Sequence, residues 1–462
     1  MSRNRIWDAP RSRREFLGWG AFAASTALVS PALLRGGPAA GAETGPGYGP
    51  LREDAGGVVD LPRGFQYRIL SAEQAVLTSG QEVPADHDGM AAFRGPGNTT
   101  VLVRNHELRD DEAPAVEGAN PYDAKEPGGT TAIVVGPDRR EVRSYVTSSG
   151  TRNNCAGGAT PWGTWLTCEE DREEGHGFVF EVQHDAPESD LSKTPIRAMG
   201  LFSHEAVGID PRTSIAYLTE DDFVGDVDPL DPSKDTRSSF LFRYIPDDRG
   251  HEPGALQRGG ALEALVVDEE AAPRDPDLFD EGQGFPVRWI PVRPELAHED
   301  ALERGATRFN RLEGAFFAGG AFWFDDTAGG EARLGQVYRL IPGAGGDTLE
   351  LFLEADDANA MESPDNIVVT PFGDLWFAED GDGVNRVMGI TPDGGVYEFA
   401  RNRISGSEFA GPCFSPDGRT FFVNVQSPGL TLAIWGPFPR RSGARRRQMA
   451  HAAPPAALAR RP

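Results

Sequence analysis

The stretch DNIVVTPFGDLWFAE, residues 365–379, carries the pattern that best indicates the fold of this chain. An acidic residue leads into a short apolar run, a turn with Pro, Gly and Asp follows, and a second apolar run ends on an acid. Short apolar runs separated by turn residues are typical of antiparallel strands. This stretch therefore predicts a β-hairpin with a carboxylate at each end.

The same pattern occurs six times along the chain. The six copies are residues 88–105, 155–169, 205–220, 313–325, 365–379 and 411–424. Third strands are expected at residues 131–135, 177–182, 239–244, 335–340, 386–390 and 432–435, with 394–399 as an outer fourth strand. Six units of up to four antiparallel strands predict an all-β fold, a six-bladed β-propeller. Residues 65–70 are expected to pair with the last blade and close the ring. A flat β-sandwich is the competing architecture, and the regular repeat disfavours it.

The ends of the chain predict three segments. Residues 1–42 are expected to be a twin-arginine signal peptide, with SRREFL at 12–17, an uncharged stretch at 18–34 and a small-residue cleavage site at 40–42. We expect residues 43–438 to form a single propeller domain and 439–462 to be a basic disordered tail. The protein would then meet the twin-arginine translocation machinery and be secreted, in the periplasm or outside the cell. The alternative is a cytoplasmic protein with a chance Arg-Arg pair.

Net charge and hydropathy restrict the classes of partner that this protein can have. The formal net charge of −26 over 462 residues disfavours nucleic acid as a partner. Past the N-terminal segment no stretch has the ~20 apolar residues of a transmembrane helix, so we expect no membrane span. A closed propeller needs no partner for stability, so a monomer is expected.

Three cysteines leave at least one thiol unpaired. Cys168 and Cys413 stand in apolar, strand-like contexts and are interpreted as buried small residues or as a disulfide. Cys155 stands in a glycine-rich loop, NNCAGG at 153–158, and needs another explanation.

A propeller brings the hairpin ends together. The first strand of each blade lines the central channel, so its start and the end of the second strand share one channel mouth. The residues at these positions are Asp88, Asn105, Cys155, Glu169, Glu205, Glu220, Glu313, Asp325, Asp365, Glu379 and Asn424. Crowded carboxylates raise one another's pKa unless cations bind among them. We therefore predict a metal site at one mouth of the channel. The oxygen donors suit calcium, and the thiolate indicates a transition metal.

One cation accompanies these acids. Arg311 lies two residues before Glu313, and residues two apart in a strand share a side. A guanidinium at a metal site is suited to a bidentate grip on phosphate. The alternative is a structural arginine paired with a nearby acid.

These motifs resemble the PhoX-type alkaline phosphatases. The resemblance runs from about residue 61 to 438 and is strongest in NCAGGATPWGTWLTCEE at 154–170. Further matching segments are NHE at 105–107, SHEAVG at 203–208, ATRF at 306–309 with RLEG at 311–314, SPDNI at 363–367 and LWFAED at 375–380. The resemblance implies twin-arginine export, a propeller fold, and a site with ferric iron (Fe3+) and calcium (Ca2+). It implies Cys155 as an iron ligand, and Glu169, Glu205, Glu313, Asp365 and Glu379 as ligands of iron or calcium. Asn105 and Arg311 would bind the substrate phosphate.

The expected function is therefore a secreted metal-dependent phosphatase. It would hydrolyse phosphate monoesters by metal-assisted attack of an oxygen nucleophile. The chain departs from the family at Leu312, where a proline is usual. His106 and His204 are expected to pack beside the site rather than act as acids. The alternatives are a calcium-dependent lactonase-like propeller, which needs one cation and neither Cys155 nor Arg311, and a calcium-stabilised binding propeller without catalysis.

Overall fold

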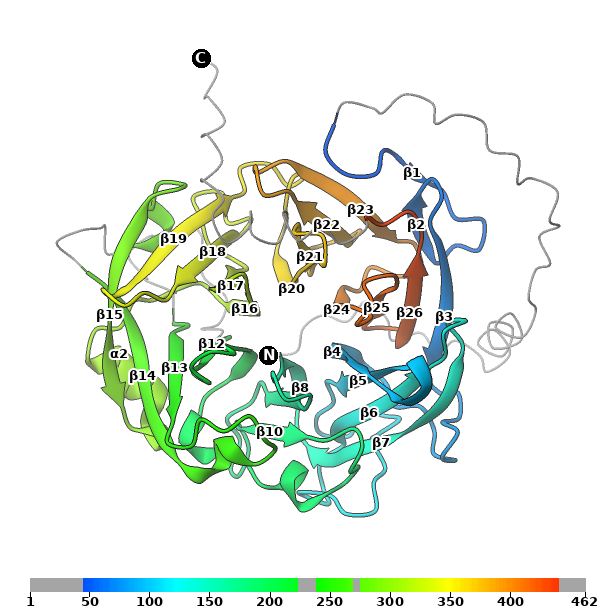
Figure 1. Cartoon of the computed structure of the whole chain (residues 1–462), viewed down its shortest axis with the longest axis horizontal. Coiled ribbons are helices and arrows are strands. Elements are labelled where there is room, and N and C mark those ends of the chain that lie inside the picture. The colour runs from blue at the N-terminus through cyan, green and yellow to red at the C-terminus, as the bar shows by residue number, and fades with distance from the viewer. Residues whose placement is uncertain (1–44, 223–237, 269–274, 440–462) are drawn as a thin grey trace. The chain divides into compact units, whose positions relative to one another are not determined.

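The computed structural model describes residues 45–222, 238–268 and 275–439. The predicted signal peptide and nearly all of the predicted basic tail lie outside these residues. Contacts within the chain define a compact unit that begins at Pro46. This unit is built almost entirely of β-strands, arranged around a central axis (Figure 1). The predicted all-β, propeller-like arrangement is confirmed.

Hydrogen bonds divide the strands into five sheets. The first holds, in order, β4 (His87–Arg94), β5 (Thr100–His106), β6 (Gly128–Val135) and β7 (Glu141–Thr151). The second holds β10 (Val179–Val182), β9 (Trp165–Glu169) and β8 (Asn154–Ala159). The third, of nine strands, holds β11 (His204–Ile209), β12 (Ala216–Glu220), β13 (Leu241–Pro246), β14 (Gly260–Val267), β15 (Gly284–Val292), β19 (Asp347–Glu354), β18 (Gln336–Ile341), β17 (Ala321–Asp326) and β16 (Leu312–Ala318).

The remaining two sheets contain the N-terminal strands. One holds β1 (Leu51–Arg52), β2 (Val59–Pro62), β23 (Val396–Asn402), β22 (Arg386–Ile390), β21 (Leu375–Glu379) and β20 (Pro364–Val369). The other holds β24 (Phe409–Phe414), β25 (Phe421–Val425), β26 (Leu430–Trp435) and β3 (Gln66–Ala72). The helical segments are α2 (Ala297–Glu303) and the 3-10 turns Pro96–Asn98, Asp190–Lys193, Arg197–Met199, Ala255–Arg258, Pro276–Leu278 and Pro294–Leu296.

Six separate four-stranded blades are not what the hydrogen bonds show. In the nine-stranded sheet, β15 pairs with β19 from Gly284 opposite Glu350 to Val287 opposite Asp347, which joins two of the predicted repeats. The second sheet has three strands, and the sheet that ends in β20 has six. The predicted closure of the ring is confirmed, because β3 near the N-terminus pairs antiparallel with β26.

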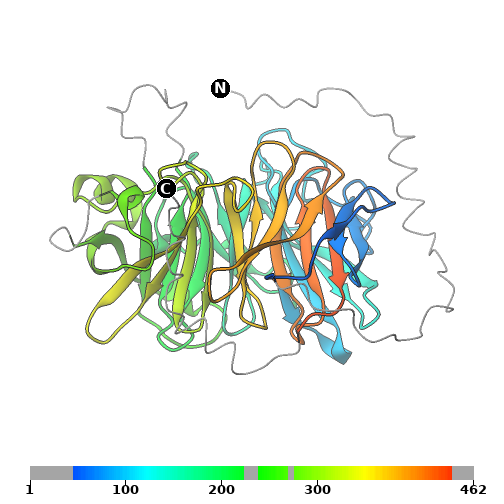
Figure 2. The same cartoon turned by 90° about the horizontal axis from the view of Figure 1, so that it is seen from above.

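Six strands line the central axis: β4, β8, β11, β16, β20 and β24. Each contacts the next, and β24 contacts β4, so these inner strands form a closed ring. Side on, the strands run between the two faces of the ring (Figure 2). Glycines allow this close approach. A Cβ on Gly314 would lie 2.2 Å from the Asp365 carbonyl oxygen, and one on Gly158 would lie 1.8 Å from that of Val207.

The core lies between neighbouring sheets. Trp376 of β21, Phe399 of β23 and Phe421 of β25 are fully buried in one cluster that spans two sheets. In β21 and β25 near-continuous apolar runs supply these side chains, as expected for strands buried on both faces. Burial of such faces holds the blades in place and fixes where the strand ends lie.

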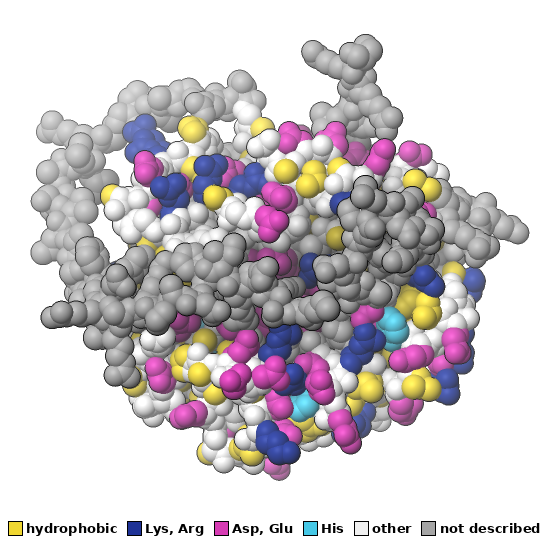
Figure 3. Space-filling view, turned by 180° about the vertical axis from the view of Figure 1, so that it is seen from behind, with side chains coloured by type: hydrophobic (Ala, Val, Ile, Leu, Met, Phe, Trp, Pro, Cys, Tyr) yellow, Lys and Arg dark blue, Asp and Glu magenta, His cyan; other side chains and the backbone are white. Residues whose placement is uncertain are grey.

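Acidic side chains are spread among Lys and Arg over the face of the molecule seen from behind (Figure 3). Within the described residues, no helix has the length and apolar character that a bilayer crossing requires.

Candidate functional site

Every inner strand begins with a β-bulge. The pairing register shifts just after the first strand residue or two in β4, β8, β11, β16, β20 and β24. A bulge inserts an extra residue and re-aims its side chain. In the first five of these strands the first bulged residue is the predicted ring residue: Asp88, Cys155, Glu205, Glu313 and Asp365. In β24 the bulge contains Gly411 and Pro412, which offer no ligand.

A second feature, a backbone hydrogen bond, recurs at all six inner strands. The residue just past the second strand donates its backbone N–H to the carbonyl of the residue two positions before the first bulged residue, or three positions before it in β24. These bonds run from Glu107 to Asp86, Glu170 to Asn153, Asp221 to Ser203, Thr327 to Arg311, Asp380 to Ser363 and Gln426 to Glu408, at 2.9–3.2 Å. They place the residue that follows each second strand beside the start of the first strand.

Four of the accepting residues have left-handed backbones. The φ angles are 42° at Asp86, 48° at Asn153, 66° at Arg311 and 47° at Ser363. A non-glycine residue in this region costs about 1–3 kcal/mol and is found where the surrounding structure imposes it. The repetition at equivalent positions indicates that these turns shape the channel mouth.

The strand ends bring potential metal ligands into three groups. The groups are Cys155, Glu170 and Glu205; Glu205, Glu313 and Asp365; and Asp88, Glu107 and Glu408. Within each group the ligand atoms lie within 4.8 Å of one another, and Glu205 belongs to two groups. The predicted residues Cys155, Glu205, Glu313 and Asp365 are thus brought together.

The carboxylates of this site are buried beside one another. Burial, followed by the charges of neighbouring carboxylates, raises the pKa of Glu205 and of Glu313 well above the ordinary value. Burial and the charge of Asp380 raise the pKa of Asp365 to about 7. Carboxylates this close disfavour one another's ionised form, and a cation bound among them would offset that repulsion.

Cys155 lies in a strand, although its glycine-rich surroundings predicted a loop. It is the second residue of β8, and its Sγ lies 3.2 Å from the carbonyl oxygen of His204. Burial and the charge of Glu205 raise the pKa of its thiol well above the ordinary value. All three cysteines are described and buried, and none forms a disulfide, so Cys168 and Cys413 are buried small residues as first interpreted.

Arg311 lies at the same mouth, clamped by two carboxylates. Its Nε lies 3.2 Å from both carboxylate oxygens of Asp221, and its Nη2 donates to Asp221 Oδ2 at 2.9 Å. Nη2 also donates to Glu313 Oε1. Burial lowers the pKa of Arg311, but Glu313 and Asp221 outweigh it and raise the pKa above its ordinary value. The side chain is one-fifth exposed and reaches the mouth.

The pattern of the family described as "Alkaline phosphatase PhoX" matches residues 46–429. The chain belongs to the PhoX alkaline phosphatase family. Membership confirms the resemblance and the expectation of an alkaline phosphatase.

Among solved structures, the chain is similar to PhoX of Pseudomonas fluorescens in complex with vanadate, described as a transition state analogue. The TM-score is 0.63 at 19% identity, over 82% of this chain and 96% of that one. A gluconolactonase from Xanthomonas campestris gives a TM-score of 0.43 at 12% identity, over 85% and 99% of the two chains. No curated protein sequence matches the chain significantly. The first similarity supports the propeller fold.

Glu169 and Glu379, two of the predicted metal ligands of this PhoX family member, have carboxylates that are bonded to partners inside the protein. Glu169 accepts hydrogen bonds from His176 and from the backbone N–H groups of Arg152, Gly177 and Phe178, at 2.7–3.2 Å. Glu379 pairs with Arg386 at 2.6 Å. Because successive strand residues face opposite sides, the carboxylates at the mouth belong to the following residues, Glu170 and Asp380.

Asn105, predicted to bind phosphate, is fully buried. Its Nδ2 donates to the carbonyl oxygens of Cys155 at 2.9 Å and Ala156 at 2.7 Å. Its Oδ1 accepts from Trp165 Nε1 at 2.8 Å and Thr167 Oγ1 at 3.0 Å. These four bonds use the full hydrogen-bonding capacity of the Asn105 amide inside the protein.

The PhoX site contains residues that the sequence reading missed. They are Glu107, Glu170 and Glu408 in the ligand groups, Asp221 on Arg311 and Asp380 beside Asp365. Four of them occupy one repeated position, the residue just past the second strand. In the sequence this position is an acid that directly follows the predicted hairpin ends at Glu169, Glu220 and Glu379 and comes two residues after Asn105.

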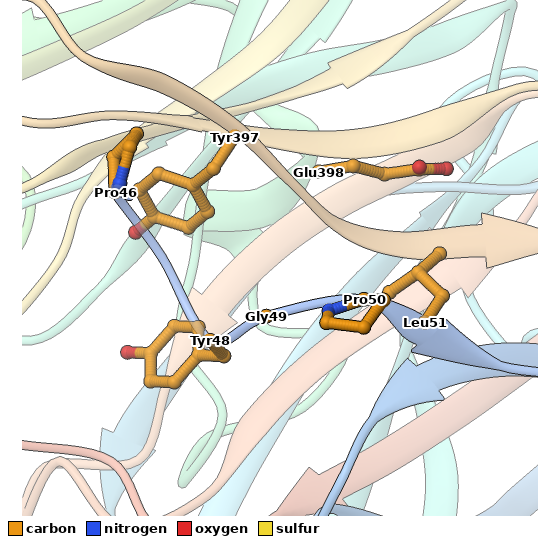
Figure 4. Close-up of a pocket in the computed structure, with 7 residues that line it drawn as sticks. All are labelled: Pro46, Tyr48, Gly49, Pro50, Leu51, Tyr397 and Glu398. Atoms are coloured by element: carbon orange, nitrogen blue, oxygen red, sulfur yellow. The ribbon is translucent and has the colours of Figure 1, made fainter. Parts of the chain in front are cut away.

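Two cavities lie apart from these ligand groups. One of about 270 Å³ lies along the channel from the bulges onward and is lined mainly by Gly, Ala and apolar residues of the inner strands. The other, of about 150 Å³, lies between Tyr48 and Tyr397 where residues 46–51 cross β23 (Figure 4). No side chain of the three ligand groups lines either cavity.

Proposed function

We propose that this protein is a secreted, metal-dependent phosphatase that hydrolyses phosphate monoesters at the acidic mouth. The single observation that carries the proposal is the contact of Arg311 with Glu313, because it puts a phosphate-binding group on the edge of a buried carboxylate cluster. Arginine is the side chain best suited to bind phosphate oxygens in pairs. Cations among the carboxylates would make the mouth attractive to a dianion.

The donor sets fit the two metals that the family resemblance implies. The group of Cys155, Glu170 and Glu205 offers one thiolate and two carboxylates, which suits ferric iron. The group of Asp88, Glu107 and Glu408 offers oxygen alone and suits calcium. Glu205, Glu313 and Asp365 would hold a further ion between them. This set replaces Glu169 and Glu379, whose oxygens are occupied by structural partners.

Bound ions would supply Lewis-acid polarisation of the phosphoryl group and an activated oxygen nucleophile. The protein's own residues supply position and charge. Arg311 would donate to the equatorial phosphate oxygens and stabilise the charge that grows there. Asp221 holds the guanidinium by its Nε edge. Asn105 keeps Cys155 in place through the β8 carbonyls.

The two histidines beside the site would not act as proton donors to the leaving group. His106 is fully buried between the carbonyl of Ala85 and the hydroxyl of Thr131. His204 is fully buried against the carbonyl of Gly200. Both serve in packing, as the sequence reading expected.

The finer architecture and the cellular setting are part of the same proposal. We count six blades, with the nine-stranded sheet as two blades joined at their outer strands, in one domain from residue 43 to 438. Residues 1–42 would direct a folded monomer through the twin-arginine machinery. Folding before export would allow iron to bind Cys155 before the thiol meets an oxidising exterior.

A lactonase-like or purely binding propeller accounts for less of the site. Neither needs a thiol between Glu170 and Glu205, and neither needs Arg311 clamped at the mouth. Family membership and these two features favour the phosphatase.

The test is hydrolysis of a phosphate monoester such as p-nitrophenyl phosphate by the purified mature protein with calcium present. Cys155→Ala and Arg311→Ala are expected to lose at least about 100-fold in kcat/KM, because each removes a group used in the transition state. Cys413→Ala, a buried cysteine away from the mouth, is the matched control and should retain activity. Absence of hydrolysis by the wild type, or full activity in both variants, would overturn the proposal.

A further inference from the structure

Glu313 belongs to two sets of contacts at once. Its carboxylate is one of the three groups that converge with Glu205 and Asp365 within 4.8 Å. It also accepts a hydrogen bond from Nη2 of Arg311. A cation held by Glu313 and the guanidinium of Arg311 would therefore compete for one carboxylate.

The charges decide how this competition affects phosphate. Arg311 contacts Asp221 and Glu313 and also lies in the field of Glu170, so ionised carboxylates outnumber the one guanidinium. This excess of negative charge repels a phosphate dianion. A divalent cation held by Glu205, Glu313 and Asp365 makes the local charge two units less negative and gives the Glu313 carboxylate a stronger partner than Arg311. Nη2 would then turn to a phosphate oxygen.

The rest of Arg311 is fixed, so it would not follow Glu313. Its backbone N–H donates to Ser239 Oγ at 3.2 Å, and its carbonyl accepts from the N–H of Thr327 at 2.9 Å. Asp221, which is buried, takes the Nε edge with both oxygens. Asp221 is therefore the lasting partner of Arg311, and Glu313 the exchangeable one.

We infer that Arg311 exchanges Glu313 for phosphate when a cation occupies the group of Glu205, Glu313 and Asp365, with Asp221 as the positioning residue that holds the guanidinium. The inference rests on the proposed function and adds a coupling between cation binding and phosphate binding. Cation and phosphate bind with positive cooperativity, while Arg311 by itself opposes the cation. Coupling of this kind is reciprocal and commonly amounts to 5–150-fold in affinity.

The test measures binding rather than turnover. Isothermal titration calorimetry follows micromolar inorganic phosphate added to the mature protein, first after EGTA treatment and then with calcium restored. Calcium is expected to tighten phosphate binding by about tenfold or more. A second titration measures calcium binding without phosphate.

Two variants should move calcium affinity in opposite directions. Arg311→Met loses phosphate binding but binds calcium about tenfold more tightly, because the competing guanidinium is gone. Asp221→Asn binds calcium more weakly, because Arg311 then relies more on Glu313. Arg311→Gln gives a second measurement if Arg311→Met folds poorly by circular dichroism. Arg386→Met, which removes a guanidinium from Glu379 outside the ligand groups, is the matched control and should leave both affinities unchanged.

The outcomes separate the inference from the function. If the wild type hydrolyses phosphate esters but binds phosphate equally with and without calcium, the exchange is overturned and the phosphatase stands. Wild-type or weaker calcium affinity in both Arg311→Met and Arg311→Gln overturns it too. A wild type that neither hydrolyses esters nor binds phosphate overturns the proposed function and the inference together.

Discussion

Glu169 and Glu170 are neighbours in the chain, yet they serve opposite sides of one strand end. Glu169 is fully buried and accepts four hydrogen bonds inside its blade. Glu170 reaches the channel mouth, where its carboxylate lies within 4.8 Å of the ligand atoms of Cys155 and Glu205. We therefore expect Glu169 to stabilise the fold and Glu170 to hold a metal ion.

Substitution of these two acids separates the tasks. Glu170→Gln is expected to lose bound iron and activity while the metal-free protein keeps its melting temperature. Glu169→Gln is expected to lower the free energy of unfolding by about 1–3 kcal/mol, since it leaves buried donors with a poorer acceptor. Iron content by absorption spectroscopy and thermal unfolding check the pair. Iron loss confined to Glu169→Gln would contradict the assignment.

Asn105 gives a second test, of position against substrate binding. Asn105→Ala removes the partner of two carbonyls and of an indole N–H, each worth about 1–3 kcal/mol, while the Thr167 hydroxyl keeps its bond from Asn154. We expect reduced stability and a lower kcat with KM for the phosphate ester nearly unchanged. Asn359→Ala, in an exposed loop, is the control. A large rise in KM with kcat preserved would show that Asn105 contacts the substrate after all.

The inner ring leaves no room for a side chain at Gly314. A Cβ there would lie 2.2 Å from the Asp365 carbonyl and 2.7 Å from the Ile367 nitrogen, both backbone atoms. Gly314→Ala should destabilise the protein by about 1–3 kcal/mol and separate Glu313 from Asp365, which weakens calcium binding. Gly345→Ala, with nothing within 4 Å, should change stability by less than about 0.5 kcal/mol. Chemical denaturation and calcium titration measure both effects. Equal stability of the two variants would refute close packing at the ring.

Metal removal should make stability depend on pH in a definite direction. The pKa of Asp365 is raised to about 7 from 3.8, and those of Glu205 and Glu313 are raised well above 4.5, by burial first and then by neighbouring acids. Between these ordinary values and about pH 7 the folded state binds more protons than the unfolded chain. The free energy of unfolding of the metal-free protein therefore falls as pH rises through this window.

Thermal unfolding from about pH 5 to about pH 8, after EDTA treatment, measures this fall. Saturating calcium should flatten it and stabilise most at the high end, where the carboxylates are charged. A metal-free melting temperature that rises with pH would contradict the buried cluster.

Local sequence patterns were enough to predict the repeated hairpins, the closure of the ring by residues near the N-terminus, and the ring residues Asp88, Cys155, Glu205, Glu313 and Asp365. These depend on local patterns: apolar runs, turn residues, and a ligand at the start of each first strand. Nearly all of the PhoX family motifs also lie in short contiguous segments of the chain. Local information was enough because strand starts are marked by composition.

Which of two adjacent acids lies at the mouth could not be predicted from local patterns, because it depends on the folded ring. Side chains alternate along a strand, so an error of one residue exchanges Glu170 for Glu169 and Asp380 for Glu379. The bulges and rim hydrogen bonds that set this register join segments distant in the chain. The same holds for Asp221, which meets Arg311 across 90 residues, and for Asn105, which meets Cys155 across 50. A side chain's direction at a blade end is fixed by the neighbouring blade, and that neighbour exists only after the ring has closed.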